Sequence, residues 1–124
     1  IFDGLLVRDE FKQKSPDLVL AFLKDYEQIA RTFKQEPKEV VETMTKFLNV
    51  DEAAVMRSLN TFYPVPAREQ LQSHWMGKPG EKDTGVLKTL QTQAQFLLES
   101  AQISAMPKDL SGLVDSSFVA KMAA

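Results

Sequence analysis

The sequence predicts a mainly α-helical chain, with about five to six helices and one or two short strands. Two observations carry this prediction. From residue 15 onward, apolar residues recur at steps of three and four, which is the period of an amphipathic helix. Six prolines and five glycines divide this pattern into pieces of helix length. Only the first eight residues carry a continuous apolar run that suits a strand.

The predicted strand covers residues 1–8, with Leu5, Leu6 and Val7 in unbroken apolar sequence. Such a run is typical of a strand that is buried on both faces. Its backbone N–H and C=O groups need partners. A second strand at residues 61–65 is the weak candidate, and the alternative is a partner on chain outside this sequence.

The remaining chain, residues 15–124, is predicted to be helical. Ser15-Pro16 starts a long helix that ends at Glu36, because Ser can cap a helix and Pro suits its first turn. Asp51 and either Asp83 or Thr84 are predicted to cap later helices. The further helices are expected at residues 37–48, 51–59, 67–75, 84–101 and 114–122, with a loop at residues 76–83. We expect one segment over residues 1–124, without a linker between two domains.

Composition excludes several kinds of function. The chain has 124 residues and a formal net charge of −2, which argues against a nucleic-acid partner. It contains no Cys, so disulfides and thiolate metal sites are excluded. No apolar run approaches the length of a transmembrane helix, and the given residues show no basic segment followed by an apolar one as in a signal peptide. Because the first residue lies inside a buried-looking strand, we expect a mature product or a piece of a longer protein.

The sequence offers little for catalysis. His74 is the single His, which excludes metal sites built on His pairs. No phosphate-binding loop and no nucleophile elbow is present. We therefore predict no catalytic residues, no metal and no cofactor. His74 and Trp75 have two interpretations, a stacking platform or, the one we favour, an aromatic pair that closes the edge of a core.

Asp3 is the one ionisable residue that stands out, since it opens the apolar run beside Gly4. A buried carboxylate needs a cation or strong hydrogen bonds. A glycine beside it lets another group approach the backbone closely. Considered on the residues alone, an exposed or capping Asp3 is the favoured interpretation, and a binding carboxylate is the alternative.

Several motifs favour the alternative, that Asp3 is a binding carboxylate. Asp3, Val7, Arg8 and Phe11, followed by Pro16, Val19, Ala21 and Phe22, resemble a D-x-x-x-V-R-x-x-F…P-x-x-V-x-A-F signature. That signature belongs to periplasmic solute-binding proteins of ABC importers, in the taurine, alkanesulfonate and nitrate group. Further segments resemble the taurine branch in particular. They are Tyr63-Pro64, Glu69-Gln70-Leu71, Trp75-Met76-Gly77, the Thr92–Leu97 stretch followed by Ile103, and Leu110–Val119.

The resemblance implies the C-terminal portion of a two-lobed α/β fold of the type II periplasmic-binding-protein class. Residues 1–8 would then be a strand near the hinge, and the N-terminal lobe would be missing from this chain. The implied function is to bind taurine or a related small sulfonate in the periplasm, or on a membrane-anchored lipoprotein, and to deliver it to an ABC permease of the inner membrane. The acidic residue that holds the ligand's ammonium group aligns with Asp3, and the Gly4 backbone is a further candidate contact.

Two other functions stay open. Enzymes of thiamine-pyrimidine synthesis share the implied fold, but their chemistry needs His and Cys residues, and this chain has one His and no Cys. A free-standing helical interaction module is the third possibility. Gly4-Leu5 also departs from the bulkier pair that some family members carry, which leaves the choice among taurine, other sulfonates and related amines open.

Overall fold

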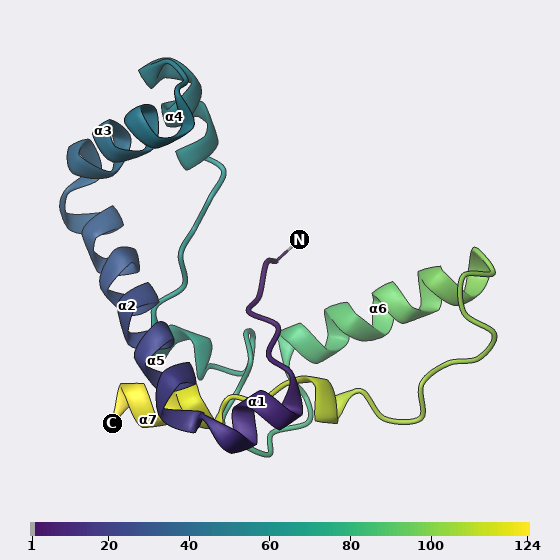
Figure 1. Ribbon diagram of the computed structural model, residues 1–124. Helices are drawn as coiled ribbons and strands as arrows, with labels where there is room; N and C mark the ends of the chain where they lie inside the picture. The colour runs from purple at the N-terminus through teal and green to yellow at the C-terminus, as the bar shows by residue number, and fades with distance from the viewer. Residues whose placement is uncertain (1) are drawn as a thin grey trace. The chain divides into compact units, whose positions relative to one another are not determined.

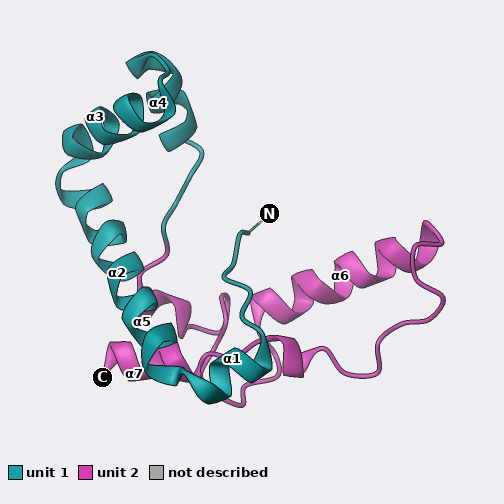
Figure 2. Cartoon of the chain, viewed as in Figure 1, with its two compact units in different colours: residues 1–64 teal, residues 65–124 magenta. Residues whose placement is uncertain are grey.

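The computed structural model describes residues 2–124 and divides the chain into two compact units, residues 1–64 and residues 65–124 (Figure 2). Across residues 2–124 the secondary structure consists of seven α-helices and one short 3-10 helix, and these residues form no strand. The regular secondary structure of these residues is all helical, so the predicted strands and the predicted α/β fold are wrong.

In the first unit, an extended segment at residues 2–8 is followed along the chain by four helices (Figure 1). The helices are α1 (Asp9–Lys14), α2 (Pro16–Gln35), α3 (Pro37–Leu48) and α4 (Glu52–Leu59). Each helix packs on the next one along the chain. Val41 of α3 and Val55 of α4 are buried, and they form the centre of the packing at that end of the unit.

Local chemistry explains the helix ends of this unit. Pro16 and Pro37 occupy the first turns of α2 and α3, where a missing N–H costs nothing. Asn49 ends α3 in the left-handed conformation, with φ of 53°. The Asp51 side chain accepts from the Ala54 N–H at 2.7 Å and so caps α4. Ser15, in contrast, makes no capping hydrogen bond, so that part of the prediction is wrong.

The second unit contains α5 (Ala67–Gln70), α6 (Gly85–Glu99), the 3-10 helix η1 (Ser111–Leu113) and α7 (Ser117–Ala123). α5 packs on α7, where Ala67, Phe118 and Val119 are buried. Thr84 rather than Asp83 caps α6, because its hydroxyl accepts from the Leu87 N–H at 3.3 Å. α5 ends five residues before the predicted residue 75, where the chain continues in turns.

The strand prediction for residues 1–8 fails for a physical reason. Residues 2–8 are extended, but a strand exists only when a second chain segment pairs with it. No described segment does so, and the candidate at residues 61–65 runs from a turn into an unpaired extended stretch. The sequence also failed to predict α1, whose six residues contain a single apolar side chain, Phe11.

The chain exposes more surface than compact units of its size would. Its accessible surface is 9428 Å². The whole chain has a mass of 14.0 kDa, and two separate compact proteins of about 7 kDa would together expose about 8,000 Å². Large apolar side chains contribute to the excess, among them Leu6 at 97% exposure and Phe47 at 86%.

Candidate functional site

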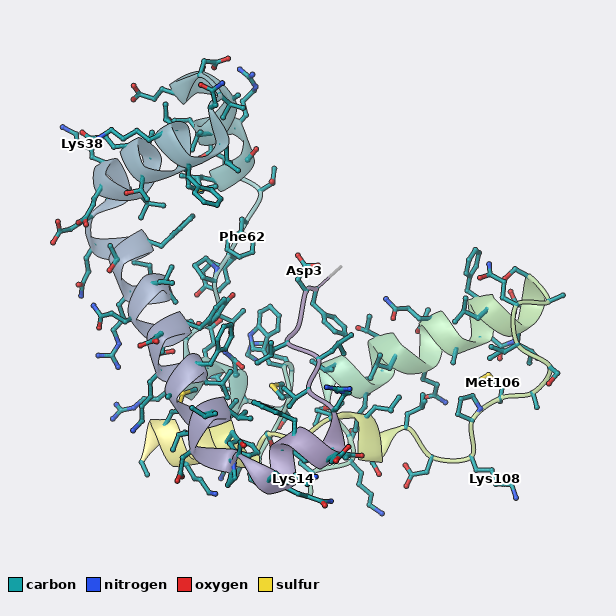
Figure 3. The ribbon with its side chains drawn as sticks, in the orientation of Figure 1. Asp3, Lys14, Lys38, Phe62, Met106 and Lys108 are labelled. Carbon is teal, nitrogen blue, oxygen red and sulfur yellow. The ribbon has the colours of Figure 1, made fainter. Side chains whose placement is uncertain are left out.

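Asp3 lies on the extended segment that precedes α1 (Figure 3). Its side chain is exposed, and it makes no hydrogen bond or ion pair with any residue of 2–124. Gly4 beside it is equally open, since a Cβ built there would have no neighbour within 4 Å. The structure therefore presents a carboxylate that no described residue neutralises, beside a stretch of accessible backbone.

An apolar groove begins two residues after Asp3. It is an open depression of about 420 Å³ between the extended segment and the start of α2. Arg8 supplies the only charged side chain of the lining. The lining residues are Leu5, Leu6, Val7, Arg8, Phe11, Leu18, Val19 and Phe22. A groove of this volume is within the range of small-molecule sites.

The groove continues as an apolar stripe along α2. Leu18, Phe22, Tyr26 and Ile29 follow one another at steps of four, four and three residues, so they share one face of the helix. All four side chains are exposed, whereas Val19 and Ala30 on a neighbouring face are buried. The sequence periodicity predicted one wide apolar face for α2, but only part of that face is covered.

The start of α6 is a second place where a ligand group would be expected, because helix N-termini attract anions. Here the chain satisfies these donors itself. Gly85 donates to the Ser73 carbonyl at 2.8 Å, Val86 donates to the Trp75 carbonyl at 3.0 Å, and the cap accepts from Leu87. No N–H group of the first turn is left for a sulfonate.

His74 and Trp75 belong to the same loop. Their ring centroids lie 5.7 Å apart at an angle of 49°, and the Trp75 indole N–H donates to Glu69 at 3.3 Å. Trp75 is half-buried and His74 is exposed. The backbone carbonyls of this loop hold α6, which agrees with the interpretation that Trp75 closes a core edge.

Glu81 is the charged residue that organises this loop. The Ser73 hydroxyl and the Lys78 backbone N–H, the latter at 3.0 Å, hydrogen-bond to its carboxylate and lower the pKa of Glu81 below its ordinary value. A small pocket of about 110 Å³ lies beside it, lined partly by Lys78, Lys82 and Ser116. Because the carboxylate of Glu81 is used internally, we assign it a structural role.

Residues 2–124 contain no cluster of three or more His, Asp or Glu side chains that could hold a metal ion. In the same residues, no helix combines the length and apolarity needed to cross a membrane. Comparison with protein-family models, curated proteins and solved structures finds no match for this chain. The candidate ligand-binding region is thus Asp3, the Gly4 backbone and the adjoining groove.

The groove itself was missed in the sequence analysis. Its signal was present, since Leu18 and Phe22 of α2 share one helix face and Leu5 and Leu6 precede them. The helical periodicity predicts a core position for Phe22, because periodicity cannot tell a covered apolar face from an open one.

Proposed function

We propose that this chain acts in the substrate-binding component of an ABC importer. It would bind taurine or a related small sulfonate outside the cytoplasmic membrane and deliver it to a membrane permease. The proposal rests on the order of the motifs that resemble the taurine branch, and on Asp3. It does not rest on the α/β fold, which the described residues lack.

The observation that carries the proposal is the unpaired carboxylate of Asp3. The next two acidic residues along the chain have partners, since Glu10 binds Lys14 at 2.7 Å and Asp9 binds Lys12 at 3.3 Å. Asp3 has no such partner among the described residues. A carboxylate left without a cation is suited to a ligand that brings its own.

Taurine supplies that charge, because at neutral pH it carries an ammonium group at one end and a sulfonate at the other. The ammonium group would donate charge-assisted hydrogen bonds to the Asp3 carboxylate. The accessible backbone at Gly4 would contribute a second contact. The sulfonate needs N–H donors, and the start of α6 does not offer them because its own loop occupies them. We therefore assign the sulfonate contacts to polypeptide other than α6.

The test is calorimetric titration of taurine into the natural gene product that contains these residues. We expect saturable binding that falls at least tenfold in Asp3→Asn and is retained in Asp25→Asn, a matched exposed carboxylate on α2. Unchanged affinity in Asp3→Asn would remove Asp3 from the site. If the unaltered protein binds neither taurine nor another sulfonate, the proposed function itself is wrong.

A free-standing helical interaction module is the second candidate. The observation that favours it is that residues 2–124 are helical without a sheet and expose the apolar stripe of α2. Such a module would melt cooperatively as the 124-residue chain and would bind no sulfonate. Calorimetry and thermal unfolding of the same sample therefore separate the two functions.

A further inference from the structure

The extended segment at residues 2–8 has an unsatisfied backbone. The N–H and C=O groups of residues 2–7 make no hydrogen bond with any described residue, and the carbonyl of Arg8 is the first to accept one, from Lys12. Leu6 is 97% exposed, and Leu5 is half exposed. An extended chain with free backbone groups and exposed apolar side chains is a template for pairing with another extended chain.

We propose that this segment pairs with the same segment of a second copy of the chain, in antiparallel orientation, with Leu5 opposite Leu5 of the second copy. The pair would be about 20 Å long. It would join two copies through one closed, self-complementary contact. This inference is independent of the proposed transport function.

Charge determines the orientation. A parallel, in-register pair would place Asp3 beside Asp3 and Arg8 beside Arg8, and like charges opposite one another destabilise a strand pair. The antiparallel pair avoids both contacts. It places Asp3 opposite Val7, Gly4 opposite Leu6, and the Arg8 guanidinium opposite the Phe2 ring.

Charge and the number of paired residues together select the register. Two-fold symmetry permits shifts of the strand pair only in steps that keep paired side chains on the same face. Moving the centre from Leu5 to Leu6 would bring Asp3 opposite Asp9 of the second copy. Moving it to Gly4 would place Val7 opposite the first residue of the second copy and leave Arg8 without an opposite residue. The register centred on Leu5 pairs all residues from 2 to 8 without opposing like charges.

The groove beside the segment supplies the apolar contact. Unbroken apolar sequence from Leu5 to Val7 puts apolar side chains on both faces of the pair. One face of the first copy's segment borders the groove that Phe11, Leu18 and Phe22 line. A second copy of the segment would extend the cover of this groove with the apolar side chains on the same face of its own strand.

The first experiment is light scattering of the purified 124-residue chain over a wide range of concentration. We expect the mass to rise from 14.0 kDa toward twice that value and no further. Leu6→Lys should hold the chain as a monomer, and Leu113→Lys, which alters a Leu that is 71% exposed in the other unit, should not. A chain that stays monomeric, or a Leu6→Lys variant that still dimerises, would overturn the proposal.

The second experiment tests the register by cross-linking, which the absence of Cys makes possible. Leu5→Cys places two thiols directly opposite each other, at a spacing that a disulfide tolerates. Val7→Cys separates the two thiols by four residues, or about 13 Å. We expect fast oxidation to a covalent dimer for Leu5→Cys and slow oxidation for Val7→Cys. Equal rates, or the reverse order, would exclude this register.

Discussion

The backbone N–H of Gly85 donates to the carbonyl oxygen of Ser73 at 2.8 Å, and this contact holds the loop of residues 71–84 against the start of α6. A Cβ at Gly85 would overlap the backbone carbonyl of His74. Position 85 therefore admits only glycine unless the loop moves away. The loop, rather than a ligand, completes the first turn of α6.

Gly85→Ala is expected to destabilise the second unit by about 1–3 kcal/mol, since the new methyl group must displace backbone rather than a flexible side chain. Urea unfolding of the 124-residue chain measures the change in unfolding free energy. Gly112→Ala is the control, because a Cβ at that position meets nothing within 4 Å. Equal effects at the two positions would contradict the assigned role of Gly85.

Asp51→Ala is expected to cost about 1 kcal/mol, because it removes the side chain that accepts from the Ala54 N–H at 2.7 Å. The loss should be visible in the free energy of urea unfolding and in helix content by circular dichroism. Ser15→Ala offers the comparison, since Ser15 precedes α2 without making a capping bond. A larger loss for Ser15→Ala than for Asp51→Ala would show that the capping assignments are reversed.

Val55→Ala is expected to cost about 2 kcal/mol, because Val55 is 2% exposed and its truncation leaves a cavity between α3 and α4. Phe47→Ala on α3 removes a larger side chain that is 86% exposed. It should change stability by less than about 0.5 kcal/mol. Thermal unfolding of both variants decides the point, and a greater loss from Phe47→Ala would show that α3 presents its other face to the core.

Glu81 predicts a pH dependence for the second unit. The Ser73 hydroxyl and the Lys78 N–H lower the pKa of Glu81, so the folded state binds a proton less readily than the unfolded state. The stabilisation is present above the ordinary carboxyl value of about 4.5 and disappears as the pH falls through the lower folded value. Glu81→Gln should be less stable than the parent at pH 7, and the difference should shrink in acid.

The control for this experiment is Glu42→Gln, since Glu42 makes no hydrogen bond or ion pair with the described residues. Unfolding by urea at a series of pH values gives the unfolding free energy of each variant, and of the parent, as a function of pH. Asp109 contributes in the same direction, because bonds from Ser111 lower the pKa of Asp109. For that reason, the unfolding free energy of the parent is subtracted from that of each variant at every pH, which removes the contribution of Asp109. A difference for Glu81→Gln that grows in acid would contradict the assignment.

The helix boundaries were the predictable part of the fold, because they depend on local chemistry. Pro16, Pro37, Asn49 and Asp51 act within one helix turn, and the structure confirms each of them. Thr84 resolves the choice that the sequence left open. Short-range rules sufficed at these positions because no distant segment takes part.

The features that the sequence did not predict correctly depend on distant partners or on weak local signals. Residues 2–8 have strand composition, but composition supplies no pairing segment. α1 forms without an apolar pattern, and its charged pairs Asp9–Lys12 and Glu10–Lys14 follow helical spacing instead. In the candidate site, the sequence identified Asp3 as a charged residue of interest. It did not reveal the groove, because Phe22 has the same periodicity whether its face is covered or open.

The buried apolar residues of the described chain are mostly small. Apart from Phe118 and Pro64 they are all Val or Ala, whereas Phe22, Phe47, Phe62 and Phe96 lie exposed. The heat capacity change of unfolding scales with the apolar area that unfolding newly exposes. This chain already exposes much of that area when folded, so its heat capacity increment should be small for its length. Calorimetric scans would then show only a small step in heat capacity between the folded and unfolded baselines, and any partner that covers the aromatic side chains would enlarge that step.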